Sequence, residues 1–304
     1  MFFKIKMLGR FSLLREDNQP VEIESRKALE LFCYLLLYRN RPHTREALAE
    51  TIWGETSSSR SKKYIRQALW QIQSALGTPA AREIGPLILT DNEWVQINPD
   101  AKFCLDVADI ETAYETVRDH HGKELQEEQF LKIKEATIQY QGDLLEGWFE
   151  DWCLFERERL QNIYLMMLDK CMGYCETHHA FEEALAFGEN ILRYDIARER
   201  THRRMVRIYY MAGERTSAIR QYERCVATLQ EELGVKPAKK TVELYERICE
   251  DHAHFLQPAF SQALTASSTP ELITRLHHLE KMVDDFHRKV CEEIRTLEQS
   301  LKQA

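Results

Sequence analysis

One stretch of the chain, residues 60–74, carries side chains that suit contact with a nucleic acid. If the stretch is helical, one of its faces holds basic and amide groups and an indole, with no acid among them: Arg60, Lys63, Gln67, Trp70, Gln71 and Ser74, with Arg66 at the edge. Glutamine can pair with both edge groups of adenine, arginine with guanine, and lysine with phosphate. The alternative interpretation is the solvated face of an ordinary helix.

A second group of chemically capable residues is Cys171, Cys175, His178 and His179, which lie within nine positions of one another. Two thiolates and an imidazole at this spacing can approach a metal ion, but structural zinc sites usually take their ligands from loops. We therefore expect the cysteines to pack inside a helix pair, and we predict no metal and no cofactor. The sequence contains no Gly-rich phosphate loop, GxSxG or HExxH motif, so an enzyme is not expected.

The basic face requires two helices to position it. The first is predicted over residues 44–53, with Thr44 as its N-cap. Gly54–Ser59 is rich in Gly and Ser and is predicted to be a turn. In the second helix an apolar stripe at steps of four, three and four lies opposite the basic face: Ile65, Leu69, Ile72 and Leu76.

Short strands are predicted on both sides of these helices. Residues 2–8, 11–14 and 21–23 have strand-like patterns, and a helix is expected to start after Ser25 as its cap. Residues 87–97 are predicted to form a β-hairpin around Asp91–Asn92. Together these elements predict a winged helix-turn-helix over residues 1–99. Because Asp91 and Glu93 would stand near the tip of the wing, we expect the wing to add little affinity for phosphates.

Within this fold, each polar residue has an expected role in contact with double-stranded DNA. Bases are expected to be contacted by Lys63, Gln67, Trp70 and Gln71, and phosphates or base edges by Arg60, Lys62 and Arg66. A phosphate at the N-terminus of the preceding helix is expected to be held by Arg41, His43 and Thr44. For Trp70 a second interpretation is packing against a neighbouring domain.

Charge is distributed unevenly along the 304 residues. Residues 1–99 hold 14 Lys and Arg against 11 Asp and Glu, whereas the remainder holds 27 against 38. A mildly basic N-terminal part permits DNA binding. The eight cysteines form no CxxC pair, the first ten residues are too charged for a signal peptide, and no apolar run is long enough to span a membrane. We therefore expect a cytoplasmic protein with reduced cysteines and no membrane contact.

Residues 100–256 are predicted to be an all-α domain of tetratricopeptide-like repeats. Ala184 and Leu192 recur as Ala218 and Val226, a period of 34 residues. Trp148 and Trp152 are expected to be core or interdomain anchors. Six arginines surround the connection between repeats: Arg193, Arg198, Arg200, Arg203, Arg204 and Arg207. They indicate either a solvated surface balanced by nearby Glu or a contact with an acidic partner or another domain.

The last part of the chain is predicted to be a linker over residues 257–270 and an amphipathic helix over residues 271–304. The helix has a heptad pattern of apolar residues, typical of a coiled coil: Leu272, Leu276, Leu279, Val283, Phe286, Val290, Ile294, Leu297 and Leu301. Pairing with a second copy is the preferred interpretation, which predicts a homodimer. Folding back onto the repeat domain is the alternative.

Several motifs resemble a known family. TREALAETIWG at residues 44–54 and QSALG at residues 73–77 resemble the DNA-binding domain of OmpR-type regulators and of the Streptomyces antibiotic regulatory proteins (SARPs). Residues 140–160 and 204–248 are similar to the start and the end of the bacterial transcriptional activator domain. The resemblance covers residues 1–250 and implies an activator that binds promoter repeats and recruits RNA polymerase, with the polymerase contact at Gly54–Ser59.

The sequence thus predicts a mainly α protein that binds specific DNA sequences and activates transcription. The rival hypothesis is a protein-interaction adaptor whose winged helix contacts protein instead of DNA. The acidic wing and the small positive excess of the N-terminal part favour the rival.

Overall fold

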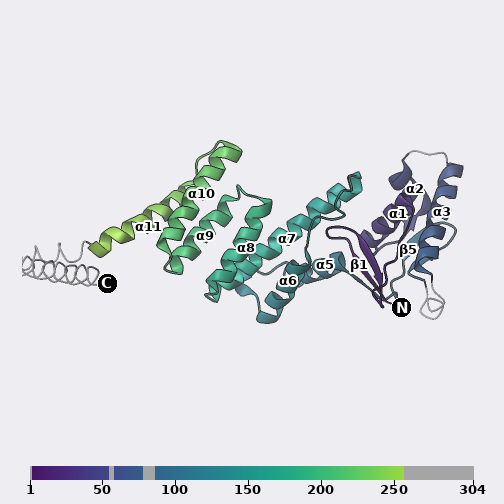
Figure 1. Ribbon diagram of the computed structural model, residues 1–304, viewed down its shortest axis with the longest axis horizontal. Coiled ribbons are helices and arrows are strands. Elements are labelled where there is room, and N and C mark those ends of the chain that lie inside the picture. Colours follow the sequence, from purple (N-terminus) through teal and green to yellow (C-terminus); the bar gives the residue numbers. More distant parts are fainter. Residues whose placement is uncertain (1, 55–57, 78–85, 257–304) are drawn as a thin grey trace, which may run out of the picture. The chain divides into compact units, whose positions relative to one another are not determined.

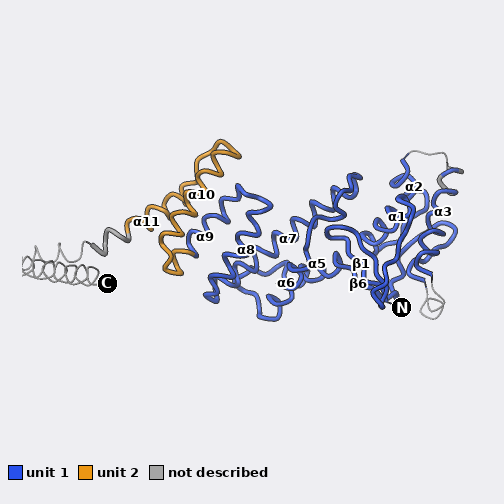
Figure 2. The backbone as a smooth tube through the Cα atoms, viewed as in Figure 1, with its two compact units in different colours: residues 1–208 blue, residues 209–304 orange. Residues whose placement is uncertain are grey.

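The computed structural model describes residues 2–54, 58–77 and 86–256 and shows a mainly α chain. The chain divides into two compact units, residues 1–208 and 209–304 (Figure 2). The predicted linker and the predicted C-terminal heptad helix lie outside the described residues. Within the described part, no helix has both the length and the apolar character needed to cross a membrane.

A three-stranded sheet opens the first unit (Figure 1). Its central strand β1 (Phe3–Lys6) pairs antiparallel with β2 (Ser12–Arg15) and parallel with β6 (Phe103–Leu105). The strand predicted over residues 21–23 is absent, so that prediction was wrong. Pro20, which has no N–H to donate, makes only an isolated bridge to Leu14. The third strand comes instead from β6, far along the chain.

The helix-turn-helix and its hairpin agree with the sequence prediction. Their elements are α1 (Arg26–Leu37), β3 (His43–Thr44), α2 (Arg45–Trp53), α3 (Ser58–Leu76), β4 (Ile88–Thr90) and β5 (Trp94–Ile97). Ser25 Oγ accepts a hydrogen bond from the N–H of Ala28, and Thr44 Oγ1 accepts one from Ala47, so both predicted N-caps are confirmed. Because α3 begins at Ser58, it starts inside the predicted turn.

Helices make up most of the chain beyond β6 (Figure 1). They are α5 (Asp106–Glu115), a 3₁₀ turn η1 (Gly122–Glu124), α6 (Glu127–Gln139), α7 (Asp151–Thr177), α8 (Phe181–Tyr194), α9 (Glu199–Met211), α10 (Arg215–Leu233) and α11 (Lys239–Leu256). Ala184 and Ala218, which define the 34-residue period, are both fully buried. Gly213, at φ +81°, makes a tight turn before α10.

The end of β1 is joined to the segment that precedes α7. Gly9 N–H donates to the carbonyl of Asp143 over 2.8 Å, and Leu145 N–H donates to the carbonyl of Met7 over 2.8 Å. From the start of α5, the Asp106 carboxylate accepts the N–H groups of Met7 and Leu8. The winged helix and the first part of the helical region are therefore connected by main-chain hydrogen bonds inside one unit.

Two tryptophans strengthen the same junction, as the sequence predicted. Trp148 is buried, and the guanidinium of Arg26 lies 3.6 Å from the centre of one of its rings. Trp152 meets the ring of Tyr34 edge to face at 5.6 Å. Trp148 thus anchors the segment before α7 to α1, and Trp152 anchors the first turn of α7 to α1.

Ion pairs and a hydrogen bond link the residues that follow α1 to α5 and α7 beside these rings. Glu111 pairs with Arg39 at 2.6 Å and with Arg159 at 2.5 Å. Arg159 also pairs with Glu156 at 2.6 Å, and Glu156 accepts a 3.0 Å hydrogen bond from the hydroxyl of Tyr38. Because Glu156 is buried, this network fixes the orientation of α1 relative to α7 more firmly than surface pairs do.

Candidate nucleic-acid interface

The outward face of α3 presents the residues that the sequence singled out. Exposed side chains on this helix include Arg60, Lys63, Arg66, Gln67 and Trp70. Trp70 is 67% exposed, so it does not pack into a neighbouring domain within the described structure. Gln71 is partly buried, and Lys62 lies in α3 with its side chain outside the described set. The helix contains four basic residues and no acid.

The inward face of α3 keeps this surface in place. Its apolar stripe, Ile65, Leu69, Ile72 and Leu76, is buried as predicted. The ring of Tyr64 stacks on Trp53 at the end of α2, with centroids 6.0 Å apart. At the other end, the guanidinium of Arg15 donates to the carbonyl of Ala75, where a cation complements the helix dipole.

The start of α2 departs from the predicted phosphate site. Arg41 is exposed, but His43 is only 7% exposed, and its Nε2 lies 3.1 Å from the carbonyl oxygen of Tyr38. Burial lowers the pKa of the His43 imidazole, which keeps the ring neutral near pH 7. The structure therefore does not place His43 with the outward-facing groups, and the Thr44 hydroxyl is occupied by its helix cap.

The wing tip is built around Asp91. Its Oδ1 accepts the N–H groups of Glu93 and Trp94, each at 2.7 Å. The guanidinium of Arg45 donates to the Asp91 carbonyl at 2.7 and 2.9 Å. These main-chain N–H groups lower the pKa of the Asp91 carboxyl. Asp91 thus shapes the turn, and Glu93 is the second acid at the tip.

The Asp91 contacts lead to a prediction about the pH dependence of the hairpin. Because the folded state lowers the pKa of this carboxyl, the ionised Asp91 side chain stabilises the hairpin fully above the ordinary aspartate pKa. This stabilisation is lost as the pH falls through the lowered pKa.

Asp91→Ala should make the amides of Glu93 and Trp94 exchange severalfold faster at pH 7. Protection factors from hydrogen-exchange NMR measure this effect. An equal loss of protection in a Glu93→Ala control would contradict the role given to Asp91.

The Cys–His group of α7 is arranged for packing. Cys171 and Cys175 are buried, and burial raises the pKa of both thiols, that of Cys175 to about 12. His178 instead stacks on Tyr174, with ring centroids 4.0 Å apart. Among the described residues, no three His, Cys, Asp or Glu side chains are grouped so that they could hold a metal ion.

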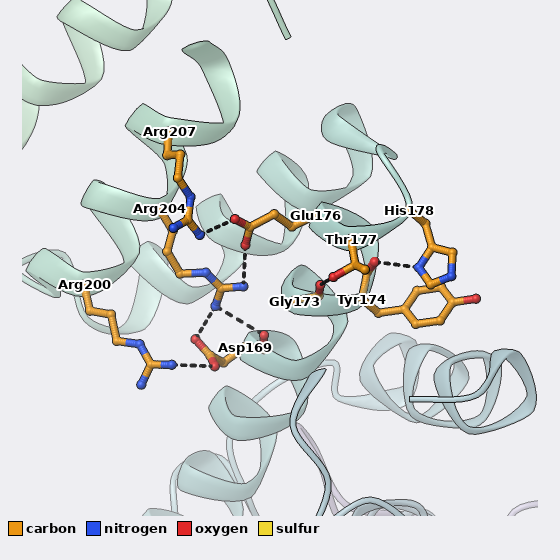
Figure 3. A network of polar contacts seen from close by, with 9 residues as sticks. All are labelled: Asp169, Gly173, Tyr174, Glu176, Thr177, His178, Arg200, Arg204 and Arg207. Atoms are coloured by element: carbon orange, nitrogen blue, oxygen red, sulfur yellow. Dashed lines mark hydrogen bonds and ion pairs between the residues drawn. The ribbon is translucent and has the colours of Figure 1, made fainter. Parts of the chain in front are cut away.

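Some of the clustered arginines join α9 to α7 (Figure 3). Arg204 pairs with Asp169 at 2.7 Å and with Glu176 at 3.3 Å, while Arg207 shares Glu176 and Arg200 reaches Asp169. The side chain of Arg204 is only 11% exposed. The expectation of a solvated surface is therefore wrong for Arg204, although nearby acids do balance its charge.

Comparison with known proteins adds family information to this geometry. The sequence model of the family described as the bacterial transcriptional activator domain matches residues 105–249. The regulatory protein AfsR of Streptomyces coelicolor is 22% identical over 277 residues, which cover 89% of this chain and 26% of AfsR. The chain therefore spans about a quarter of the length of this curated relative.

Among solved structures, the chain resembles Mycobacterium tuberculosis EmbR, which was determined in complex with a low-affinity phosphopeptide. The TM-score is 0.59 at 18% identity, and the match covers 82% of this chain and 65% of EmbR. At this identity the likeness supports the fold alone. Residues 105–249 match the bacterial transcriptional activator domain, and this match together with the similarity to AfsR supports a SARP-type transcriptional regulator.

Proposed function

We propose that the protein regulates transcription by binding specific DNA sequences, with α3 in the major groove. The observation that carries this proposal is the contrast between the two faces of α3. One face is buried on α1 and α2, and the other exposes basic and amide groups without an acid. A major-groove helix needs both properties, because it must be held rigidly while its side chains reach base edges.

The proposed roles of individual residues are those that the sequence predicts, and the exposure of Arg60, Lys63, Arg66, Gln67 and Trp70 supports them. Base edges are assigned to Lys63, Gln67, Trp70 and Gln71, and phosphates or base edges to Arg60, Lys62 and Arg66. Arg41 and the N-terminus of α2 are assigned to a phosphate. His43 has no place in this set because it is buried, and Thr44 contributes by capping α2.

Further parts of the proposal rest on sequence and family. We retain a winged helix over residues 1–99, an activator domain over residues 100–256, a linker over residues 257–270 and a dimerising helix over residues 271–304. Activation would proceed through recruitment of RNA polymerase, with Gly54–Ser59 as a contact. Dimerisation would place two α3 helices on adjacent repeats and compensate for the modest positive charge.

The test is a fluorescence-anisotropy titration of the full chain with a duplex from the region upstream of its own gene, beside a random duplex. At two salt concentrations, we expect tighter binding to the upstream duplex and a steep loss of affinity as salt rises. Absence of binding to either duplex at low salt would refute the proposal and favour the adaptor hypothesis.

A further inference from the structure

Two phenylalanine side chains are largely exposed next to the junction between the winged helix and α7. Phe149 is 76% exposed and Phe155 is 67% exposed, with Leu154 beside Phe155 in sequence and also exposed. Single exposed apolar residues are common on proteins, but three within seven positions are a local concentration of exposed apolar side chains. None of them belongs to α3 or to the β4–β5 hairpin, so the proposed DNA contact does not account for them.

The main chain under this patch is firmly held. The guanidinium of Arg157 donates to the carbonyl oxygens of Leu144, Leu145 and Trp148 at 2.9–3.0 Å. Trp148, the residue before Phe149, is itself buried under Arg26. Phe149 therefore projects into solvent from a segment that is already held in place. Binding of a partner there would cost little conformational entropy in this protein.

Acids accompany the exposed rings. In α7, Asp151, Leu154, Phe155 and Glu158 are spaced so that they share one helical face, and all four are exposed. Neither Asp151 nor Glu158 forms an ion pair with any residue in the described part of the chain. By contrast, Glu150 pairs with Arg26 and Glu156 with Arg159. We call Phe149, Asp151, Leu154, Phe155 and Glu158 the aromatic–acidic surface.

A cleft of about 510 Å³ adjoins this surface. It is lined by Lys27 and Glu30 of α1, by Thr51 and Ile52 of α2, and by residues 149–152. The lysine is already engaged, because its Nζ lies 2.6 Å from the carbonyl oxygen of Ile52 and 2.8 Å from the Glu30 carboxylate. The cleft therefore offers apolar groups from Ile52, Phe149 and Trp152 together with acids such as Glu150 and Asp151, and it is large enough to take up side chains of a partner.

We propose that the aromatic–acidic surface and its cleft are a docking site for a basic amphipathic helix of a protein partner. The apolar side chains of such a helix would cover Phe149, Leu154 and Phe155. Its Lys or Arg residues would meet Asp151 and Glu158 and stack on the exposed rings. The protein already contains this kind of contact, since Arg26 lies over Trp148 while it pairs with Glu150 at 3.2 Å.

Charge complementarity distinguishes this partner from others. Phosphates of nucleic acid are repelled by Asp151 and Glu158, and an acidic helix is repelled for the same reason. The site adds a protein contact to the proposed DNA binding and does not depend on it. A second copy of the chain is the other possible occupant, and the experiment separates the two.

The test uses the full chain, without DNA, and a fluorescein-labelled Leu/Lys peptide of about 14 residues whose leucines form one helical face. A peptide of identical composition but with scrambled periodicity is the control ligand. Anisotropy titrations should show that the amphipathic peptide binds at least about tenfold more tightly than the scrambled one. Phe149→Ser/Phe155→Ser should remove that preference, and Asp151→Asn/Glu158→Gln should weaken binding and flatten its salt dependence.

The matched control variant is Leu131→Ser/Ile138→Ser, which changes two exposed apolar residues of α6 and should leave peptide affinity unchanged. Equal binding of both peptides, or unchanged binding by the Phe149/Phe155 variant, would overturn the proposal. A third outcome would assign the surface to a second copy of the chain. In that case the unchanged protein does not bind the amphipathic peptide but self-associates, and the Phe149/Phe155 variant abolishes the self-association. Thermal melting of each variant checks that folding is intact.

Discussion

Replacing Asp106 by alanine is expected to lower the free energy of unfolding by about 3 kcal/mol. The buried Asp106 carboxylate accepts the N–H group of Met7 at 2.8 and 3.0 Å and that of Leu8 at 2.9 Å. It also accepts the N–H of Val107 at the start of α5. Alanine would leave the Met7 and Leu8 N–H groups buried without this acceptor, and each such group is costly.

Urea unfolding of the full chain, followed by circular dichroism, measures this loss. Asp106→Asn retains one acceptor oxygen and should lose less stability than Asp106→Ala. Asp109→Ala is the matched control, because Asp109 also lies in the first turn of α5 but is exposed. If Asp106→Ala and Asp109→Ala unfold at the same urea concentration, the joint between β1 and α5 is not a major source of stability.

The elements that the sequence predicts well are those whose formation depends on residues close together in the sequence. Ser25 and Thr44 are recognisable as caps because each lies immediately before an apolar-periodic run. The stripe of α3 is visible from its spacing alone, and the hairpin follows from a short polar turn between two apolar segments. Since the outer face of α3 is the complement of its stripe, the same local pattern identifies its exposed basic residues.

The features that the sequence does not reveal depend on contacts between distant residues. Residues 21–23 have a strand-like composition and lie beside β2, where the N–H of Val21 donates to the carbonyl of Leu13, but they form no strand, and the third strand of the sheet is β6, about a hundred residues later. His43 looks like a surface residue next to Arg41, yet its ring packs against Tyr34 of α1 and against Tyr38, the residue that follows α1. Glu111 is an unremarkable acid in sequence, and its role follows only from its two arginine partners.

The double substitution Lys63→Ala/Gln67→Ala is expected to weaken binding of the upstream duplex at least about tenfold, since a good base contact contributes about 1–3 kcal/mol of discrimination. Both side chains are exposed one helical turn apart on α3, and neither supports the buried stripe. Thermal stability should therefore stay unchanged. Affinity for the random duplex should fall less, because Gln67 is assigned to a base edge.

The same anisotropy titration measures both duplexes at two salt concentrations. Because Lys63 is assigned to a base edge, its loss should change the slope of log affinity against log salt by less than the value of about one that is expected for loss of a phosphate contact. Lys132→Ala/Gln230→Ala is the matched control, because it removes the same exposed charge and amide from α6 and α10. If the control weakens binding as much as the α3 variant, overall charge explains the effect. If neither does, another element of the winged helix must read the DNA.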